Sequence, residues 1–123
     1  MKIKTSELTG DALDWAVAKA EGTTLTYYDA SWWYQAIEIG LIPFSTDWSQ
    51  GGPIIERERI AVWTPMTQFK KSEWEAGKSF IDADGTELEI TQEFYGPTPL
   101  IAAMRCYVAS KLGDEVEIPE ELK

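Results

Sequence analysis

The stretch GPTPLIAAMRCYVASKLG, residues 96–113, carries the clearest helix signals in the sequence and determines what the rest of the chain must cover. Thr98 is suited to the N-cap, Pro99 to the first helical position and Gly113 to the residue that ends the helix. The apolar side comprises Leu100, Ile101, Met104, Tyr107, Val108 and Leu112, and the opposite, small side comprises Ala102, Ala103, Cys106, Ala109 and Ser110. Such a helix is expected to be buried nearly all round.

Arg105 is the exception in this predicted helix. A guanidinium among apolar residues needs a carboxylate, backbone carbonyls, an anionic ligand or a path to water. We expect a structural pairing with Glu56 or Asp47, and ligand binding is the alternative. Cys106 is expected to be a small core residue. The small side of the helix would also suit a symmetric homodimer.

A first helix is predicted within GDALDWAVAKAEG, residues 10–22. Its apolar stripe has the spacing i, i+3, i+4, i+7 and comprises Leu13, Ala16, Val17 and Ala20. Thr9 is expected to cap its free amides, and Gly22 to supply the left-handed residue after it. Trp15 lies roughly 150 to 200° around the helix from the stripe. We therefore expect Trp15 either to make a second contact within the domain or to be an exposed anchor for a partner.

Two stretches between these helices favour strands. The first is rich in Thr, Tyr, Trp and Ile, which predicts strands near residues 23–28 and 32–39 with a turn at 29–31. The second is ERIAVW, residues 58–63, which Pro65 would bring to an end.

The dipeptide Asp84-Gly85 predicts a hairpin within residues 78–90, because both residues suit the positive backbone angles of a tight turn. The polar segment 66–78 before it is expected to be a loop. Trp74 in that segment either covers the core or lies on the surface.

Composition indicates one acidic domain over residues 1–123. We expect an α+β fold with a small antiparallel sheet packed against an N-terminal and a C-terminal helix. The formal charge of −10 argues against nucleic acid, and the sequence has no apolar run long enough to span a bilayer. A single cysteine and no histidine predict neither a disulfide nor a metal site, and no cofactor is expected. Without a secretory signal at the N-terminus, the cytoplasm is the expected compartment.

The central stretch STDWSQGGPIIERE, residues 45–58, raises the question of a site. Gly51 and Gly52 before Pro53 predict a tight turn that leads into a short helix over residues 53–60, with a strand as the alternative. Exposed amides at such a turn suit an anion, with arginines 57, 59 or 105 near by. The stretch lacks the spacing of a phosphate-binding loop.

Three blocks of the sequence carry a resemblance to a known family. They are MKIKTSELTGDALDWAVAKAEG at residues 1–22, FSTDWSQGGPIIERERI at 44–60, and GPTPLIAAMRCYVASKLGDEVEIPEEL at 96–122. Together these blocks resemble the NinX-like proteins of tailed bacteriophages, a family labelled as a domain of unknown function. The resemblance implies a small accessory protein made in the infected cell, hence in the host cytoplasm, and it implies no catalytic residues.

Three functions from different classes follow. The preferred one is a non-enzymatic accessory protein that binds a host or phage protein through surface aromatics such as Trp15, Trp32, Trp33 and Trp48. The second is a binder of a small, nucleotide-like anion. The third is an enzyme built on the Asp47 and Glu56 carboxylates.

If a site exists, we expect Trp48, Glu56 and Arg105 to face one another across it. The candidate ligand- or partner-binding residues are Trp15, Asp47, Trp48, Gln50, Gly51, Gly52, Glu56, Arg57 and Arg105.

Overall fold

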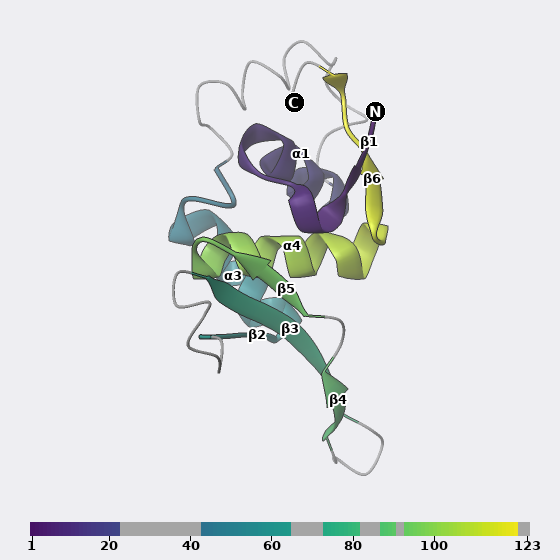
Figure 1. Ribbon diagram of the computed structural model, residues 1–123. Helices are drawn as coiled ribbons and strands as arrows, with labels where there is room; N and C mark the ends of the chain where they lie inside the picture. The colour runs from purple at the N-terminus through teal and green to yellow at the C-terminus, as the bar shows by residue number, and fades with distance from the viewer. Residues whose placement is uncertain (23–42, 65–72, 82–86, 91–92, 121–123) are drawn as a thin grey trace.

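The computed structural model describes residues 1–22, 43–64, 73–81, 87–90 and 93–120 (Figure 1). The strands predicted within residues 23–39, with Trp32 and Trp33, lie outside these ranges. The described elements are β1 (Lys2–Lys4), the 3₁₀ turn η1 (Thr5–Glu7), α1 (Gly10–Ala20), α3 (Trp48–Glu58), β2 (Ile60–Trp63), β3 (Trp74–Ile81), β4 (Glu87–Ile90), β5 (Phe94–Gly96), α4 (Pro99–Leu112) and β6 (Glu115–Glu117).

Helix α4 crosses the middle of the molecule, with α1 on one side and β2, β3 and β5 on the other (Figure 1). Its predicted ends are confirmed. The Thr98 hydroxyl accepts a hydrogen bond from the Ile101 amide at 3.1 Å, and Gly113 follows the helix with a φ of 90°. The side chains of Ala102, Ala103 and Cys106 are buried within the domain. Ala109 is partly buried and Ser110 is exposed, so the domain covers most but not all of the small side of α4.

The described strands form two antiparallel sheets. In the larger sheet, β3 pairs with β2 (Ile60 opposite Lys78), with β4 (Ser79 opposite Ile90) and with β5 (Trp74 opposite Gly96). In the smaller sheet, β1 pairs with β6, which places Ile3 opposite Val116. The predicted α+β class is confirmed: helices pack against small antiparallel sheets.

The strand β3 corrects one prediction. The polar composition of residues 74–78 predicts a loop, but they form the first five of the eight residues of β3, which pairs with β2 and β5. Ala76 and Gly77 are buried, whereas Glu75 and Lys78 make side-chain contacts at the strand's partly exposed positions. Pairing on both edges therefore outweighs the low strand propensity of these residues. Trp74 is partly buried and packs against the core, which decides between the two alternatives in favour of a cover.

The predicted hairpin strands are confirmed as β3 and β4, and the turn residues 82–86 lie outside the described part of the chain.

Helix α1 confirms the predicted bounds and corrects two details. Gly22 has a φ of 70° just after the helix, as expected. The Thr9 side chain makes no capping hydrogen bond; Thr9 and Gly10 are exposed, where solvent can satisfy the first amides. Trp15 is only 8% exposed and belongs to the core, so its interpretation as an exposed anchor is wrong. Both faces of α1 are buried, and Lys19 lies 5.2 Å from the centre of the Trp15 ring.

Candidate functional site

Helix α3 begins earlier than predicted. It starts at Trp48, because the Asp47 carboxylate accepts hydrogen bonds from the Ser49 amide at 2.9 Å and the Ser49 hydroxyl at 2.7 Å. These two hydrogen bonds lower the pKa of Asp47. The helix continues to Glu58, so the strand alternative for residues 53–60 is wrong except at Ile60 in β2.

The two glycines lie inside α3 and do not form a turn before it; neither has a positive φ. A Cβ atom on Gly51 would lie 2.4 Å from the Phe44 carbonyl oxygen and 2.6 Å from Cδ1 of Leu100. Gly51 is therefore required where α3 touches the preceding turn and α4. A Cβ on Gly52 would meet only Trp48, at 3.9 Å. Gly52 instead precedes Pro53, and a side chain before proline disfavours the helical conformation.

The predicted anion cradle is not formed. The amides of Gln50 and Gly51 both donate to the Asp47 carbonyl oxygen, each at 3.0 Å, within the first turn of α3. They are consequently not free to bind an anion.

A short turn at residues 43–47 holds the start of α3. The Thr46 and Asp47 amides donate to the Pro43 carbonyl oxygen at 3.2 and 2.9 Å. The buried Ser45 amide donates to the Asp14 carboxylate of α1 at 2.8 Å, and burial raises the pKa of Asp14. Asp14 was not among the predicted site residues, although an aspartate beside the apolar stripe of α1 was a signal for such a buried partner.

A small pocket lies where α3 and α4 begin. Its volume is about 170 Å³, and its lining comprises Ser45, Thr46, Trp48, Thr98, Leu100 and Ile101. We call it the Trp48 pocket. None of these residues is charged. Trp48 is 53% exposed, and among the described residues only Met1 is another exposed large hydrophobic.

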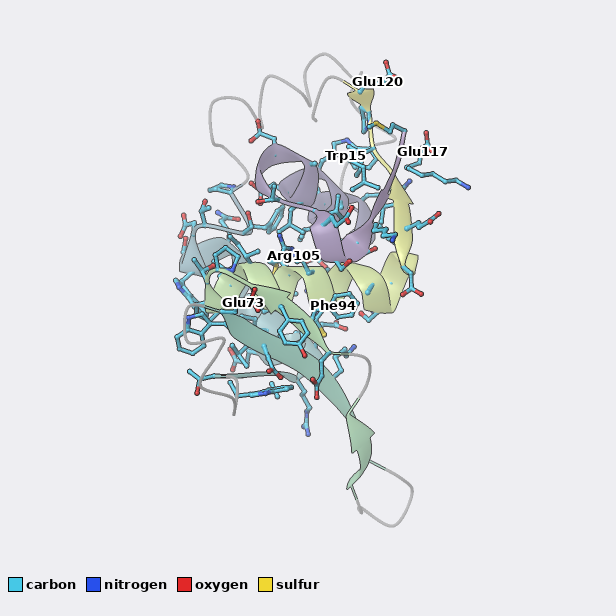
Figure 2. All side chains as sticks on the ribbon, in the orientation of Figure 1. Trp15, Glu73, Phe94, Arg105, Glu117 and Glu120 are labelled. Atoms are coloured by element: carbon cyan, nitrogen blue, oxygen red, sulfur yellow. The ribbon has the colours of Figure 1, made fainter. Side chains whose placement is uncertain are left out.

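Arg105 on α4 joins two halves of the fold (Figure 2). Its Nε donates to the Leu8 carbonyl at 2.7 Å and its Nη1 to the Tyr95 carbonyl at 2.6 Å. The expected pairing with Glu56 or Asp47 is wrong, because carbonyls from the segment before α1 and from β5 already meet at this point of α4. Burial lowers the pKa of Arg105, and the charge of Glu73 opposes that shift.

The predicted meeting of Trp48, Glu56 and Arg105 does not occur. Glu56 is exposed on α3, eight residues and about 12 Å of helix axis beyond Trp48. Asp47 and Glu56 are likewise at opposite ends of α3, so the structure does not bring this carboxylate pair together.

Arg57 lies in an ionic cluster that the sequence did not disclose. It donates from Nη1 and Nη2 to the two carboxylate oxygens of Glu21, at 3.1 and 2.7 Å, and from Nε to Glu58 at 3.0 Å. The Tyr107 hydroxyl donates to Glu21, and the guanidinium carbon of Arg57 lies 5.8 Å from the centre of the Tyr107 ring. Arg57 thus links the ends of α1 and α3 to α4.

Glu58 is the centre of the same cluster, with Lys78 and Lys111 at 3.1 and 3.3 Å. Its hydrogen bond with Arg57, followed by those with the two lysines, lowers its pKa to about 2.

Replacing Glu58 with glutamine is therefore expected to change how stability depends on pH. The native pKa of Glu58 is below the unfolded value, so its stabilising effect is present above about pH 4.5 and is lost as the pH falls towards 2. Urea unfolding across this range should show the variant less stable than the wild type at pH 7, with the difference shrinking towards pH 2. Glu56→Gln, an exposed change on the same helix, is the control. If Glu58→Gln were as much less stable than the wild type at pH 2 as at pH 7, the stabilising effect would not come from the ionised Glu58 carboxylate.

The rest of the described residues contain a second small pocket but no metal site. A second pocket of about 190 Å³ is lined by Lys4, Ser6, Phe94, Asp114 and Glu115. Within the described ranges, no three His, Cys, Asp or Glu side chains group in a way that could hold a metal ion. The described helices are all too short or too polar to cross a bilayer.

Comparison with known proteins identifies the family. The family described as Bacteriophage P22, NinX matches residues 4–111, which is most of the 123-residue chain. This match includes residues 23–43 and 61–95, outside the three blocks on which the resemblance was based. No curated protein matches the sequence. The chain therefore belongs to this NinX family of bacteriophage proteins.

Proposed function

We propose that this NinX-family protein is a non-catalytic phage accessory protein that works in the host cytoplasm by binding another protein, of host or phage origin, at the Trp48 pocket. The observation that carries the proposal is the exposure of Trp48 beside an uncharged pocket. Tryptophan is enriched among residues that dominate protein interfaces, because it offers a large contact area with few rotatable bonds. About half of Trp48 is exposed to solvent at the start of α3, where a partner can reach it.

The surroundings of Trp48 support binding because they are fixed in advance. Asp47 caps α3, Asp14 holds the turn before it, and Gly51 brings α3 against α4. A surface that is already ordered loses less conformational freedom when a partner binds.

The size of the pocket favours a protein side chain over a nucleotide. Pockets for drug-sized ligands usually have volumes of about 300 to 1,000 Å³, whereas the Trp48 pocket has about 170 Å³. Arg57 is engaged with Glu21 and Glu58, and Arg105 donates to two carbonyls. These are two of the three arginines that the anion-binding alternative would use; the third, Arg59, is exposed at the end of α3 opposite to Trp48.

Co-purification from infected cells tests the proposal. Tagged wild type should retain a specific protein that Trp48→Ala loses, while Glu7→Ala, an exposed change in η1, retains it. Because Trp48 is exposed, its replacement should leave the melting temperature nearly unchanged. Equal recovery with Trp48→Ala would exclude the Trp48 pocket as the binding site.

A further inference from the structure

We propose that the Trp48 pocket receives an aliphatic side chain from a positively charged segment of the partner protein. This inference rests on the proposed function and adds the chemistry of the partner. It follows from the lining of the pocket, from the groups beside Trp48 and from the charge of the chain.

The lining specifies an uncharged occupant. Leu100 and Ile101 supply aliphatic surface, Trp48 supplies an aromatic wall, and Ser45, Thr46 and Thr98 carry only hydroxyl groups. A charged side chain buried there would find no opposite charge to compensate for its lost hydration. With a volume of about 170 Å³, the space suits one medium-sized apolar side chain.

The walls of the pocket come from two capped helix starts. The first turns of α3 and α4 lie side by side (Figure 1), each with its own cap. Asp47 caps α3 through the Ser49 amide, and Thr98 caps α4 through the Ile101 amide. Leu100 both lines the pocket and touches the site where Gly51 has no side chain. The pocket therefore exists before any partner arrives.

The rim favours positive charge in the residues next to that side chain. The Asp47 carboxylate immediately precedes Trp48, whose exposed ring offers a face to a cation. Tyr95 lies three residues, at most about 10 Å of chain, before Thr98 of the pocket. The Tyr95 hydroxyl donates to the Glu93 carboxylate at 3.3 Å, and Glu75 lies opposite Tyr95 in the neighbouring strand β3, so two carboxylates lie beside Tyr95.

The charge of the whole chain acts in the same direction. With 21 acidic and 11 basic residues, its formal charge of −10 attracts a basic segment and speeds the encounter. A second copy of the chain has the same negative charge and is repelled. A nucleotide is both anionic and too large for the pocket.

A randomised heptapeptide library, selected on folded wild type and counter-selected on Trp48→Ala, tests the inference. Enriched peptides are expected to combine an aliphatic residue with flanking lysine or arginine. One labelled, synthesised peptide is then measured by fluorescence anisotropy. Replacing its aliphatic residue with serine should weaken binding roughly 10-fold, as should Trp48→Ala, whereas Glu7→Ala should not. Binding should also weaken as salt rises.

The outcomes separate this inference from the proposed function. The inference is overturned if the Trp48-dependent peptides are acidic, or if they bind equally well after their aliphatic residue is replaced with serine. In that case, loss of the cellular partner in Trp48→Ala would still support the proposed function of protein binding. A dimer in sedimentation that Trp48→Ala abolishes would identify a second copy as the occupant and also overturn it. Selection of no Trp48-dependent peptide, together with unchanged co-purification, contradicts both.

Discussion

Replacing Gly51 with alanine will lower the free energy of unfolding by roughly 3 kcal/mol. The new methyl group would lie 2.4 Å from the Phe44 carbonyl oxygen and 2.6 Å from Cδ1 of Leu100. Leu100 can rotate, but the carbonyl belongs to the turn that Asp14 and Pro43 hold in place, so α3 must shift away from it. Urea denaturation measures the free energy of unfolding. The melting temperature should fall by roughly 10 to 15 °C.

Gly52→Ala is the matched control one position along. Its methyl group would meet only Trp48, at 3.9 Å. Alanine gains helix propensity there but meets the ring of Pro53, so we expect a change within about 1 kcal/mol in either direction. If both variants lost the same stability, the glycines would be needed for backbone freedom and not for the contact between α3 and α4.

Replacing Arg105 with methionine is expected to cost about 3 kcal/mol or more, because a hydrogen bond to a charged group contributes roughly 1.5 to 3 kcal/mol. Methionine fills a similar space but leaves the Leu8 and Tyr95 carbonyls without their donors. Arg105→Lys retains the charge, but lysine has no planar fork to reach both carbonyls. Its free energy of unfolding should therefore lie between those of the wild type and Arg105→Met. Equilibrium unfolding in urea measures all three proteins.

Arg59→Met is the control for Arg105, since Arg59 is exposed at the end of α3. We expect it to change stability by about 0.5 kcal/mol or less. If Arg105→Met were as stable as this control and instead lost a bound anion, the functional interpretation of Arg105 would replace the structural one.

The helix ends that the sequence predicted well are those with strong local signals. Helix α4 begins after Thr98, with Pro99 as its first residue, and ends before Gly113; α1 is followed by Gly22. These signals are readable from the sequence because caps and glycines act within one turn of the backbone. The burial of α4 was likewise readable from its apolar and small sides. The α+β class followed from these helices and from the Asp84-Gly85 hairpin signal.

The errors arose where contacts distant in sequence decide the local structure. The glycine pair in α3 suggested a turn, but Gly51 is set by Phe44 and Leu100, the latter 49 positions further along the chain. The polar start of β3 suggested a loop, but β2 and β5 pair with both of its edges. No periodicity within either segment contains this information.

The candidate site was predicted in part. Trp48 is exposed beside a pocket, as a partner-binding aromatic should be, whereas Trp15 is buried. Asp47, Gln50 and Gly51 hold the first turn of α3, and Glu56 is exposed further along it. Sequence reasoning identified Arg57 and Arg105 but not their partners, because the Glu21 side chain and the Leu8 and Tyr95 carbonyls approach them only in the folded chain.

Site-specific photo-crosslinking in infected cells tests most directly whether a protein binds at the Trp48 pocket. A photoreactive residue is placed at Gln50, which is exposed two positions after Trp48, and in a separate control at Glu7. The account predicts a discrete crosslinked product from position 50 that Trp48→Ala abolishes and that position 7 does not give. The same product from position 50 in Trp48→Ala, or a product from position 7 alone, would contradict it.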